Sequence, residues 1–165
     1  MLRGFAPIHD EYAKVLILGT GPSVRSLQKM QYYGHERNAF WPIMQLLFSQ
    51  ESTTYAEKQN LLLVNQIALW DVLSSFEREG SLDSAYTDTY PNDLKSFLLD
   101  HPRILKVLFN GKKAESLYKK HINYYPEHIA FHALCSTSPA YTLPFEEKVR
   151  MYREALLNQE VYYLS

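Results

Sequence analysis

The sequence predicts an α/β fold, a three-layer α/β/α sandwich in which helices cover both faces of a short, mainly parallel, four-stranded sheet. Apolar runs typical of buried strands recur at 15–18, 67–70, 104–109 and 128–134. Segments with helical spacing of apolar residues lie between these runs. Because alternating strands and helices build right-handed crossovers, we expect the four runs to form one sheet. The length of 165 residues suits one core, so we expect a single domain over 1–165.

The first half of the chain is predicted to hold two strands and one buried helix. Residues 15–18 (VLIL) form a continuous apolar run, which is typical of a central parallel strand. Pro42 suits the first turn of a helix and apolar residues follow it, which predicts a buried helix over 42–49. For the remainder we expect an irregular segment over 1–13, a polar helix end or loop over 51–60, a helical continuation over 61–64, a strand over 67–70, a loop with a helix turn over 71–79 and a break over 80–84.

The second half of the chain alternates helices and strands more regularly. Asn92 or Asp93 is a good N-cap, and the apolar residues that follow share one face, which predicts a helix over 93–100. His101-Pro102 ends this helix. The further elements are a strand over 104–109 that ends at Asn110-Gly111, a helix over 112–121, a strand over 128–134 that runs into Ser136–Ala140, and an amphipathic helix over 145–158.

Composition and charge exclude several classes of protein. A net charge of −1 argues against a broadly polycationic nucleic-acid binder but leaves room for a local basic patch. The single Cys135 excludes a disulfide framework within the chain and a Cys-ligated iron–sulfur cluster. The histidines are scattered, so we expect no metal site. With no long apolar stretch and no signal-peptide pattern, we expect a cytoplasmic monomer with no membrane partner.

Two polar turns follow the first and the last predicted strands, Gly19–Ser23 and Ser136–Ala140. The carboxyl ends of parallel strands meet at one edge of a sheet, where ligands bind in open α/β folds. The first turn lacks the third glycine of a dinucleotide fingerprint and the Lys-Ser/Thr of a P-loop, so a plain strand-end turn is an equal alternative. The second turn by itself is most often a helix cap. Two such turns at one edge favour a polar-walled cleft.

The segment Tyr32–Trp41 gathers amide, imidazole, guanidinium and aromatic groups within ten residues. Asn38 has an alternative interpretation as a turn residue or helix cap, and Phe40 as a core anchor. A second cluster, Asn110 to Lys113, places two lysines at a helix start, where the helix dipole disfavours cations. This mismatch is tolerable where an anion binds. Both clusters therefore add candidate binding groups to the same sheet edge.

These motifs resemble the uracil-DNA glycosylase superfamily, and most closely its hypoxanthine-DNA glycosylase (DNA-deoxyinosine glycosylase) branch. The matching stretches occur in the family's order and are VLILGTGPSVRS, YYGHERNAFWPIM, ALWDVLSSFEREGSLDSAY, FNGKKAE and STSPA. YYGH-x-x-N-x-FW is the most specific of them. The resemblance implies a monofunctional enzyme of base excision repair. Such an enzyme flips a deaminated base (hypoxanthine and, in some relatives, uracil or xanthine) out of DNA and hydrolyses its N-glycosidic bond without a cofactor.

The resemblance also implies roles for individual residues. The catalytic residue is expected to be Asn38, which cannot act as a general base at neutral pH and would instead position water or stabilise developing charge. The expected base pocket comprises Gly19, Thr20, Gly21, Pro22, Ser23, Tyr32, Tyr33, His35 and Phe40, with the aromatic residues available for stacking. The expected DNA contacts are Ser136, Thr137, Ser138 and Pro139 on the minor-groove side, and Arg25, Arg37, Lys112 and Lys113 on the phosphates.

The sequence departs from the family's pattern at Gly21, where a larger residue is common. The resemblance therefore implies that one wall of the base pocket is missing. Neither polar turn contains a carboxylate, so Asp71 and Glu36 are the nearby acids that could activate water. Two rival functions remain: a catalytically inactive nucleic-acid- or nucleotide-binding protein on the same fold, and a small-nucleotide hydrolase, which would act on free nucleosides and show no salt-dependent DNA binding.

Overall fold

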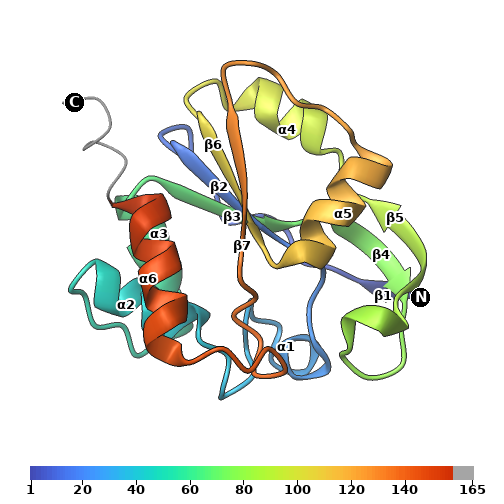
Figure 1. The fold of residues 1–165 in the computed structure, drawn as a ribbon, viewed down its shortest axis with the longest axis horizontal. Coiled ribbons are helices and arrows are strands. Elements are labelled where there is room, and N and C mark those ends of the chain that lie inside the picture. Colours follow the sequence, from blue (N-terminus) through green and yellow to red (C-terminus); the bar gives the residue numbers. More distant parts are fainter. Residues whose placement is uncertain (158–165) are drawn as a thin grey trace.

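A four-stranded parallel sheet in the order β3-β2-β6-β7 lies at the centre of the computed structural model, which describes residues 1–157 (Figure 1). Its strands are β2 (Val15–Gly19), β3 (Ile67–Asp71), β6 (Lys106–Asn110) and β7 (Ala130–Leu134). All neighbouring pairs are parallel, and Ile17 pairs with Leu69 on one side and Leu108 on the other. The predicted parallel sheet is therefore confirmed, with strand ends shifted by one or two residues.

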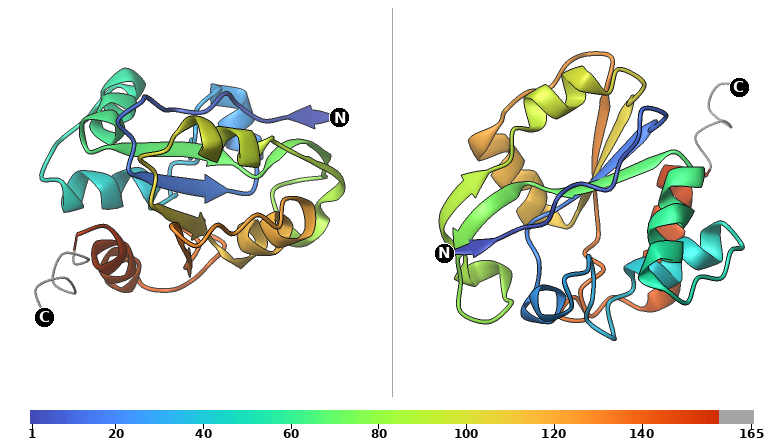
Figure 2. Two further views of the ribbon diagram at one scale, coloured as in Figure 1. Left: turned by 90° about the horizontal axis from the view of Figure 1, so that it is seen from above. Right: turned by 180° about the vertical axis from the view of Figure 1, so that it is seen from behind.

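Helices cover both faces of this sheet. One layer contains α2 (Phe40–Leu47), α3 (Tyr55–Val64) and α6 (Phe145–Leu156), and the opposite layer contains α4 (Leu94–Asp100) and α5 (Lys112–His121). The two groups stay on opposite sides of the sheet in the views of Figures 1 and 2. Successive residues of a strand point to opposite faces, so Ile17 packs into the first layer's core while Leu16 and Leu18 pack into the second. Burial on both faces explains the unbroken apolar run of β2.

A second, antiparallel sheet was not predicted from the sequence. It has the order β1-β4-β5 and consists of β1 (Leu2–Arg3), β4 (Leu73–Glu77) and β5 (Thr87–Pro91). The expectations of an irregular segment over 1–13 and of a loop with a helix turn over 71–79 were therefore wrong at these strands. Only Val72 separates β3 from β4, so the chain leaves the parallel sheet and enters the second one almost directly. Strand β4 (LSSFE) does not alternate between apolar and polar residues, because its two fully buried residues, Leu73 and Phe76, are separated by two serines. The sequence therefore shows no strand pattern there.

The remaining differences concern helix boundaries. The short helix α1 (Val24–Lys29) was missed; it begins at Ser23, whose hydroxyl accepts the Ser26 N–H. Helix α3 starts inside the stretch expected to be a helix end or loop, at a capping box formed by Thr54 and Glu57. The predicted end of the last helix at residue 158 lies outside the described residues. Within residues 1–157, no helix has the length and apolar character needed to cross a membrane.

Candidate active site

A cavity of about 340 Å³ opens at the carboxyl edge of the parallel sheet. Sites for small molecules typically have volumes of about 300–1,000 Å³, so the cavity could hold one base. Both polar turns line it, although more than a hundred residues separate them in the sequence. The cavity is lined by Gly19, Thr20, Gly21, Pro22, Ser23, Ser26, Tyr32, Tyr33, His35, Asn38, Asp71, Arg78, Ser81, Leu82, Asp83, Tyr86, Asn110, Ser136, Thr137, Ser138, Pro139 and Ala140.

The turn over 136–140 is held in place by Asn110 at the end of β6. The Asn110 side chain donates to Thr137 Oγ1 and accepts the Thr137 N–H, both at 2.9 Å. The Thr137 carbonyl in turn accepts the Ala39 N–H at 3.0 Å. Gly111 has a φ of +98°, and a Cβ there would approach Ser136 Cβ to 3.3 Å, so this turn also needs a glycine beside it. These contacts join β6, the turn after β7 and the segment before α2 into one wall.

Asn38 is both a turn residue directly before helix α2 and a cavity-lining residue. Its N–H donates to the His35 carbonyl at 3.0 Å, and its Oδ1 accepts the Phe40 N–H at 2.9 Å. Because the carbonyl oxygen of the amide is engaged, the Nδ2 hydrogens are the groups it can offer to a ligand. The interpretation of Asn38 as a turn residue therefore holds, whereas the N-cap position of α2 is Ala39. The hydrogen bond from the Phe40 N–H fixes the orientation of the Asn38 amide at the cavity.

Tyr33 lines the cavity, whereas Phe40 lies behind it. Tyr33 has a φ of +53°, in the left-handed region that non-glycine residues seldom adopt. Its ring stacks on Phe40 with a centroid distance of 4.3 Å. The expectation that Phe40 faces the base is corrected, because α2 begins at Phe40 and turns its side chain into the core. Tyr32 lines the cavity, but its hydroxyl donates to the Ala6 carbonyl at 2.7 Å.

Asp71 is the buried acid of the cavity. It ends β3, is 3% exposed, and its Oδ2 has no hydrogen-bond partner among the described residues. The Tyr33 hydroxyl is buried and equally without a partner there. A Cβ added to Gly19 would lie 2.5 Å from Asp71 Oδ1 and 2.9 Å from the Tyr33 hydroxyl, so both groups face one spot beside Gly19. Burial raises the pKa of the Asp71 carboxyl to about 7.

The connection from β4 to β5 forms an outer wall that sequence reasoning missed. A Cβ on Gly21 would come within 2.8 Å of the Phe76 ring and 3.2 Å of the Tyr86 hydroxyl. The expectation that Gly21 leaves a wall missing is therefore wrong, because the Phe76 ring of β4 and the Tyr86 side chain, from the connection to β5, occupy that place. Arg78 holds this wall by donating to the Tyr86 hydroxyl and to the Pro22 carbonyl, each at 2.8 Å. The matching stretch SFEREGSLDSAY was the one sequence signal for it.

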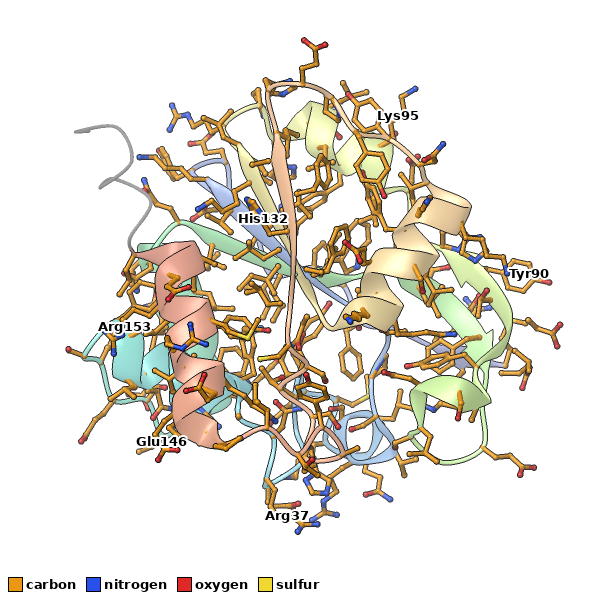
Figure 3. The ribbon with its side chains drawn as sticks, in the orientation of Figure 1. Arg37, Tyr90, Lys95, His132, Glu146 and Arg153 are labelled. Carbon is orange, nitrogen blue, oxygen red and sulfur yellow. The ribbon has the colours of Figure 1, made fainter. Side chains whose placement is uncertain are left out.

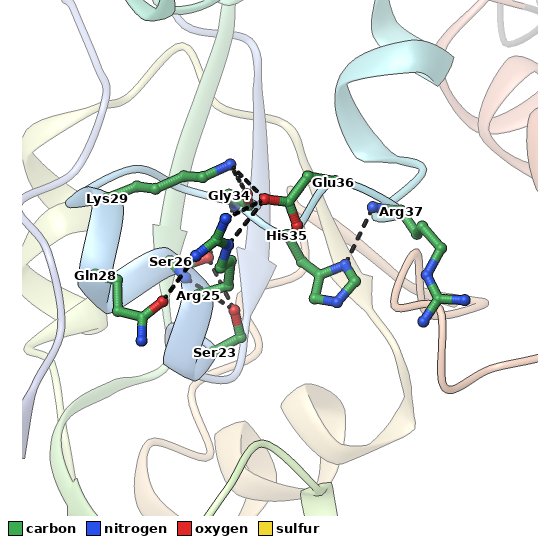
Figure 4. A network of polar contacts seen from close by, with 9 residues as sticks. All are labelled: Ser23, Arg25, Ser26, Gln28, Lys29, Gly34, His35, Glu36 and Arg37. Atoms are coloured by element: carbon green, nitrogen blue, oxygen red, sulfur yellow. Dashed lines mark hydrogen bonds and ion pairs between the residues drawn. The ribbon is translucent and has the colours of Figure 1, made fainter.

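The basic residues expected to hold phosphates differ in their surroundings. Arg25 donates to Glu36 Oε1 at 2.6 and 2.8 Å, and Lys29 lies 3.2 Å from the same oxygen (Figure 4). The Arg25 guanidinium, together with other hydrogen bonds, lowers the pKa of Glu36 to about 2. Glu36 is exposed, paired with two cations and absent from the cavity lining, so it is not placed to activate water there.

Arg37, Lys112 and Lys113 lie outside the cavity lining but near the same end of the molecule. Arg37 projects from the outer tip of the loops below the sheet (Figure 3), and its guanidinium points away from Glu36 (Figure 4). The two lysines open α5 directly after Gly111. The charge of Lys113 opposes the effect of burial on the pKa of Asp83, which places this lysine close to the outer wall. Among the residues described, no group of three or more His, Cys, Asp and Glu side chains could hold a metal ion.

A parallel α/β sheet with a cavity between two polar strand-end turns is consistent with the fold and site of DNA glycosylases of the uracil type. A sequence model of the Uracil DNA glycosylase superfamily matches residues 6–159, and the chain belongs to this superfamily. It is therefore an enzyme of the DNA N-glycosylase class.

Individual relatives agree with this membership. Hypoxanthine DNA glycosylase of Methanosarcina acetivorans is 39% identical over 114 residues, which cover 68% of this chain and 72% of the relative. Hypoxanthine DNA glycosylase of Methanosarcina barkeri is 38% identical over 114 residues, with the same coverage. The solution NMR structure of a candidate uracil DNA glycosylase from Methanosarcina acetivorans matches with a TM-score of 0.75 and 32% identity, over 93% of this chain and 97% of that one.

Proposed function

We propose that this chain is a monofunctional glycosylase that removes deaminated bases from DNA, with hypoxanthine as the main substrate and uracil and xanthine as further candidates. The observation that carries the proposal is Asn38, which lines the cavity between the two polar turns and whose Oδ1 is held by the Phe40 N–H, so that its Nδ2 is the group left to donate to a ligand. Hypoxanthine is put first because the two relatives described above are named for it. We further propose that the protein acts as a single domain and a monomer.

The target base has to leave the duplex before it can enter this cavity. Flipping costs a few kcal/mol and is least costly for a mispaired base, which favours deaminated bases over their normally paired parents. In the proposed complex, the flipped base lies between the turn over 19–23 and the turn over 136–139. The exposed Arg37 and the Lys112–Lys113 pair contact phosphates beside it. Arg25 contributes less, because Glu36 already neutralises it.

The proposed reaction transfers the glycosyl group from the base to water. The C1′–N bond breaks and its electron pair leaves with the base, so the sugar becomes cationic and the base anionic. A water molecule then bonds to C1′, and the proton it loses neutralises the base. Asn38 Nδ2 donates a hydrogen bond either to the base as negative charge develops or to the attacking water. An amide does not take up a proton at neutral pH, so Asn38 acts by position and electrostatics.

The test is base release from defined oligonucleotides. Duplex and single-stranded substrates that contain one inosine, uracil or xanthine are incubated with the protein, and the free base is measured by chromatography. Strands are examined before and after alkali, since a monofunctional enzyme leaves abasic sites that break only after treatment. We expect release from the inosine duplex and a large loss in Asn38→Ala. Equal background release by wild type and variant, with DNA binding intact, would instead identify an inactive binding protein. Release from free nucleosides without salt-dependent DNA binding would identify a nucleoside hydrolase.

A further inference from the structure

Asp71 lies where the chain passes from the parallel sheet into the antiparallel one, and its main chain is fixed on both sides of that point. Its carbonyl accepts the Asn92 side-chain amide at 2.8 Å, and the next residue, Val72, donates its N–H to Gly19 at 2.8 Å. The carboxyl is consequently held against Gly19 at the floor of the cavity. The fold thus keeps an acid buried in the candidate active site. Within the described residues, the Oδ2 atom of this acid makes no hydrogen bond, so no structural role for the carboxylate is evident.

The surroundings of Asp71 offer little to stabilise a negative charge. The tyrosines whose ionisation its charge opposes are Tyr32 and Tyr33 before α2, Tyr55 of α3 and Tyr86 of the outer wall. The other titratable or charged groups that line the cavity are His35, Arg78 and Asp83. Arg78 is occupied by Pro22, Gly80 and Tyr86. An unpaired buried carboxyl among phenols is more stable neutral than ionised.

A neutral carboxyl is a hydrogen-bond donor, and Tyr33 supplies a second donor at the same spot. Deamination replaces an exocyclic amine of a base with a carbonyl oxygen. When the glycosidic bond breaks, negative charge spreads over the leaving base and grows on such an oxygen. Two fixed donors stabilise that charge more than they stabilise the ground state, which is how oxyanion sites accelerate reactions. A protonated Asp beside a Tyr is known to serve in this way for enolates.

We propose that Asp71, in its neutral form, and Tyr33 donate hydrogen bonds to the carbonyl oxygen of the flipped base and stabilise the base as it leaves. This inference rests on the proposed glycosylase function. It assigns Asp71 and Tyr33 to the leaving base, as proton-bearing donors, whereas a water-activating base would have to be deprotonated. The acid stays protonated during the step. It also gives a reason why Gly19 must lack a side chain, since a Cβ there would collide with the Asp71 carboxyl and the Tyr33 hydroxyl and displace both donors.

The decisive measurement is the single-turnover rate of hypoxanthine release as a function of pH, under saturating enzyme. For wild type, the rate should be constant at low pH and fall about tenfold per pH unit above the pKa of Asp71, near 7. Asp71→Asn keeps an N–H donor without a titrating group, so its rate should stay flat over the same range and exceed that of wild type at high pH. Tyr33→Phe should lower the rate about 10- to 100-fold at every pH without moving the inflection.

Several outcomes would overturn the inference. A rate that rises with pH and is lost in Asp71→Asn would make Asp71 a base acting on water. Identical profiles in wild type and Asp71→Asn would show that Asp71 takes no part. The inflection should persist in His35→Gln, and its loss there would assign it to the imidazole. Infrared difference spectra of the folded protein at pH 6 should show a protonated carboxyl band that is missing from Asp71→Asn, and its absence in wild type would contradict the neutral acid. If wild type releases no base from any lesion, the glycosylase function itself fails.

Discussion

Asn110 holds Thr137 by two hydrogen bonds of 2.9 Å, one donated by its Nδ2 to Thr137 Oγ1 and one accepted by its Oδ1 from the Thr137 N–H. The pair is almost completely buried, and it joins the end of β6 to the turn that follows β7. Through the Thr137 carbonyl and the Ala39 N–H, the same contact reaches the segment that carries Asn38. The Asn110 side-chain amide therefore helps to fix the turn over 136–140 relative to the segment that carries Asn38.

Replacing this amide should loosen the cavity wall. Asn110→Ala leaves the Thr137 N–H and hydroxyl buried without partners, so we expect a loss of about 2–4 kcal/mol in the free energy of unfolding. Urea unfolding measures the loss, and amide hydrogen exchange over 136–140 should speed up at the same time. Thr137→Ser retains both hydrogen bonds and is the matched control, for which we expect a loss below about 1 kcal/mol. An Asn110→Ala protein with unchanged exchange over 136–140 would contradict the assigned contact.

The turn contact and the proposed donor role of Asn38 can be separated by substitution. Asn38→Ala removes both and should cost about 0.5–1.5 kcal/mol of stability, the typical net contribution of one hydrogen bond, in addition to most of the base release. Asn38→Asp keeps an oxygen that accepts the Phe40 N–H, so the turn should survive while the Nδ2 donor is lost. We expect Asn38→Asp to be as stable as wild type in urea unfolding and to release hypoxanthine about 100- to 1,000-fold more slowly. A fully active Asn38→Asp variant would rule out the donor role.

Gly21 should not accept a side chain, although its backbone φ is not in the left-handed region. Gly21→Ser places a Cβ 2.8 Å from the Phe76 ring, and we expect a loss of about 1–3 kcal/mol from this overpacking. Phe76→Leu in the same chain should recover part of the loss relative to the sum of the single changes. Gly80→Ala separates crowding from backbone strain: nothing lies within 4 Å of its added Cβ, but Gly80 has a φ of +71°, so its expected loss of about 1–2 kcal/mol comes from the left-handed backbone. Thermal unfolding of wild type, Gly21→Ser, Phe76→Leu, the double variant and Gly80→Ala makes the comparison.

The buried acid gives stability a pH dependence of a defined sign. The pKa of Asp71 is raised by burial from 3.8 to about 7, so the folded state binds a proton that the unfolded state has lost between these values. Stability is therefore complete below about pH 4 with respect to this group and decreases as pH rises to 7. Asp71→Asn has no titrating group at this position, so the decrease should be absent. The free energy of unfolding of the variant minus that of wild type should therefore be about 2–4 kcal/mol larger at pH 8 than at pH 4. Equal stability of wild type and variant at both pH values would contradict an unpaired acid.

The contribution of each basic residue to DNA binding should depend on whether an acidic side chain already pairs with it. Arg37→Ala and Lys112→Ala should each weaken the affinity for a lesion-containing duplex and reduce the slope of log K against log salt by about one. Arg25→Ala should reduce this slope less, because Glu36 lies 2.6 Å from its guanidinium. Fluorescence anisotropy over a range of salt concentrations measures the slopes. A larger effect for Arg25 than for Arg37 would show that DNA displaces Glu36.

The sequence was a reliable guide wherever local pattern decides structure. The apolar runs of β2 and β6 mark strands that are buried on both faces, and the helix over 112–121 has the predicted bounds. The two polar turns were placed correctly at one edge, because parallel strands must end there. Asn38 could be singled out through the YYGH-x-x-N-x-FW resemblance, and the cavity does include it.

What the sequence did not reveal depends on contacts between distant segments. The antiparallel sheet joins β1, at the start of the chain, to β4 and β5, about seventy or more residues later. Nothing in the sequence LSSFE of β4 by itself identifies a strand. The wall opposite Gly21 comes from Phe76 and Tyr86, more than fifty residues away in the sequence. Phe40, by contrast, lies behind Tyr33, because helix α2 starts two residues before Pro42, the predicted first position, and buries the Phe40 side chain.

By itself, then, the sequence determined the parallel α/β layers and the edge at which the cavity opens, because periodicity and turn residues report which face of each segment is buried and where each strand ends. The tertiary structure alone decided the chemistry of the cavity floor. Asp71 and Tyr33 face the same point beside Gly19 only because β3 crosses into a second sheet there and Tyr33 adopts a left-handed backbone. Burial raises the pKa of Asp71, and burial is a property of the whole fold.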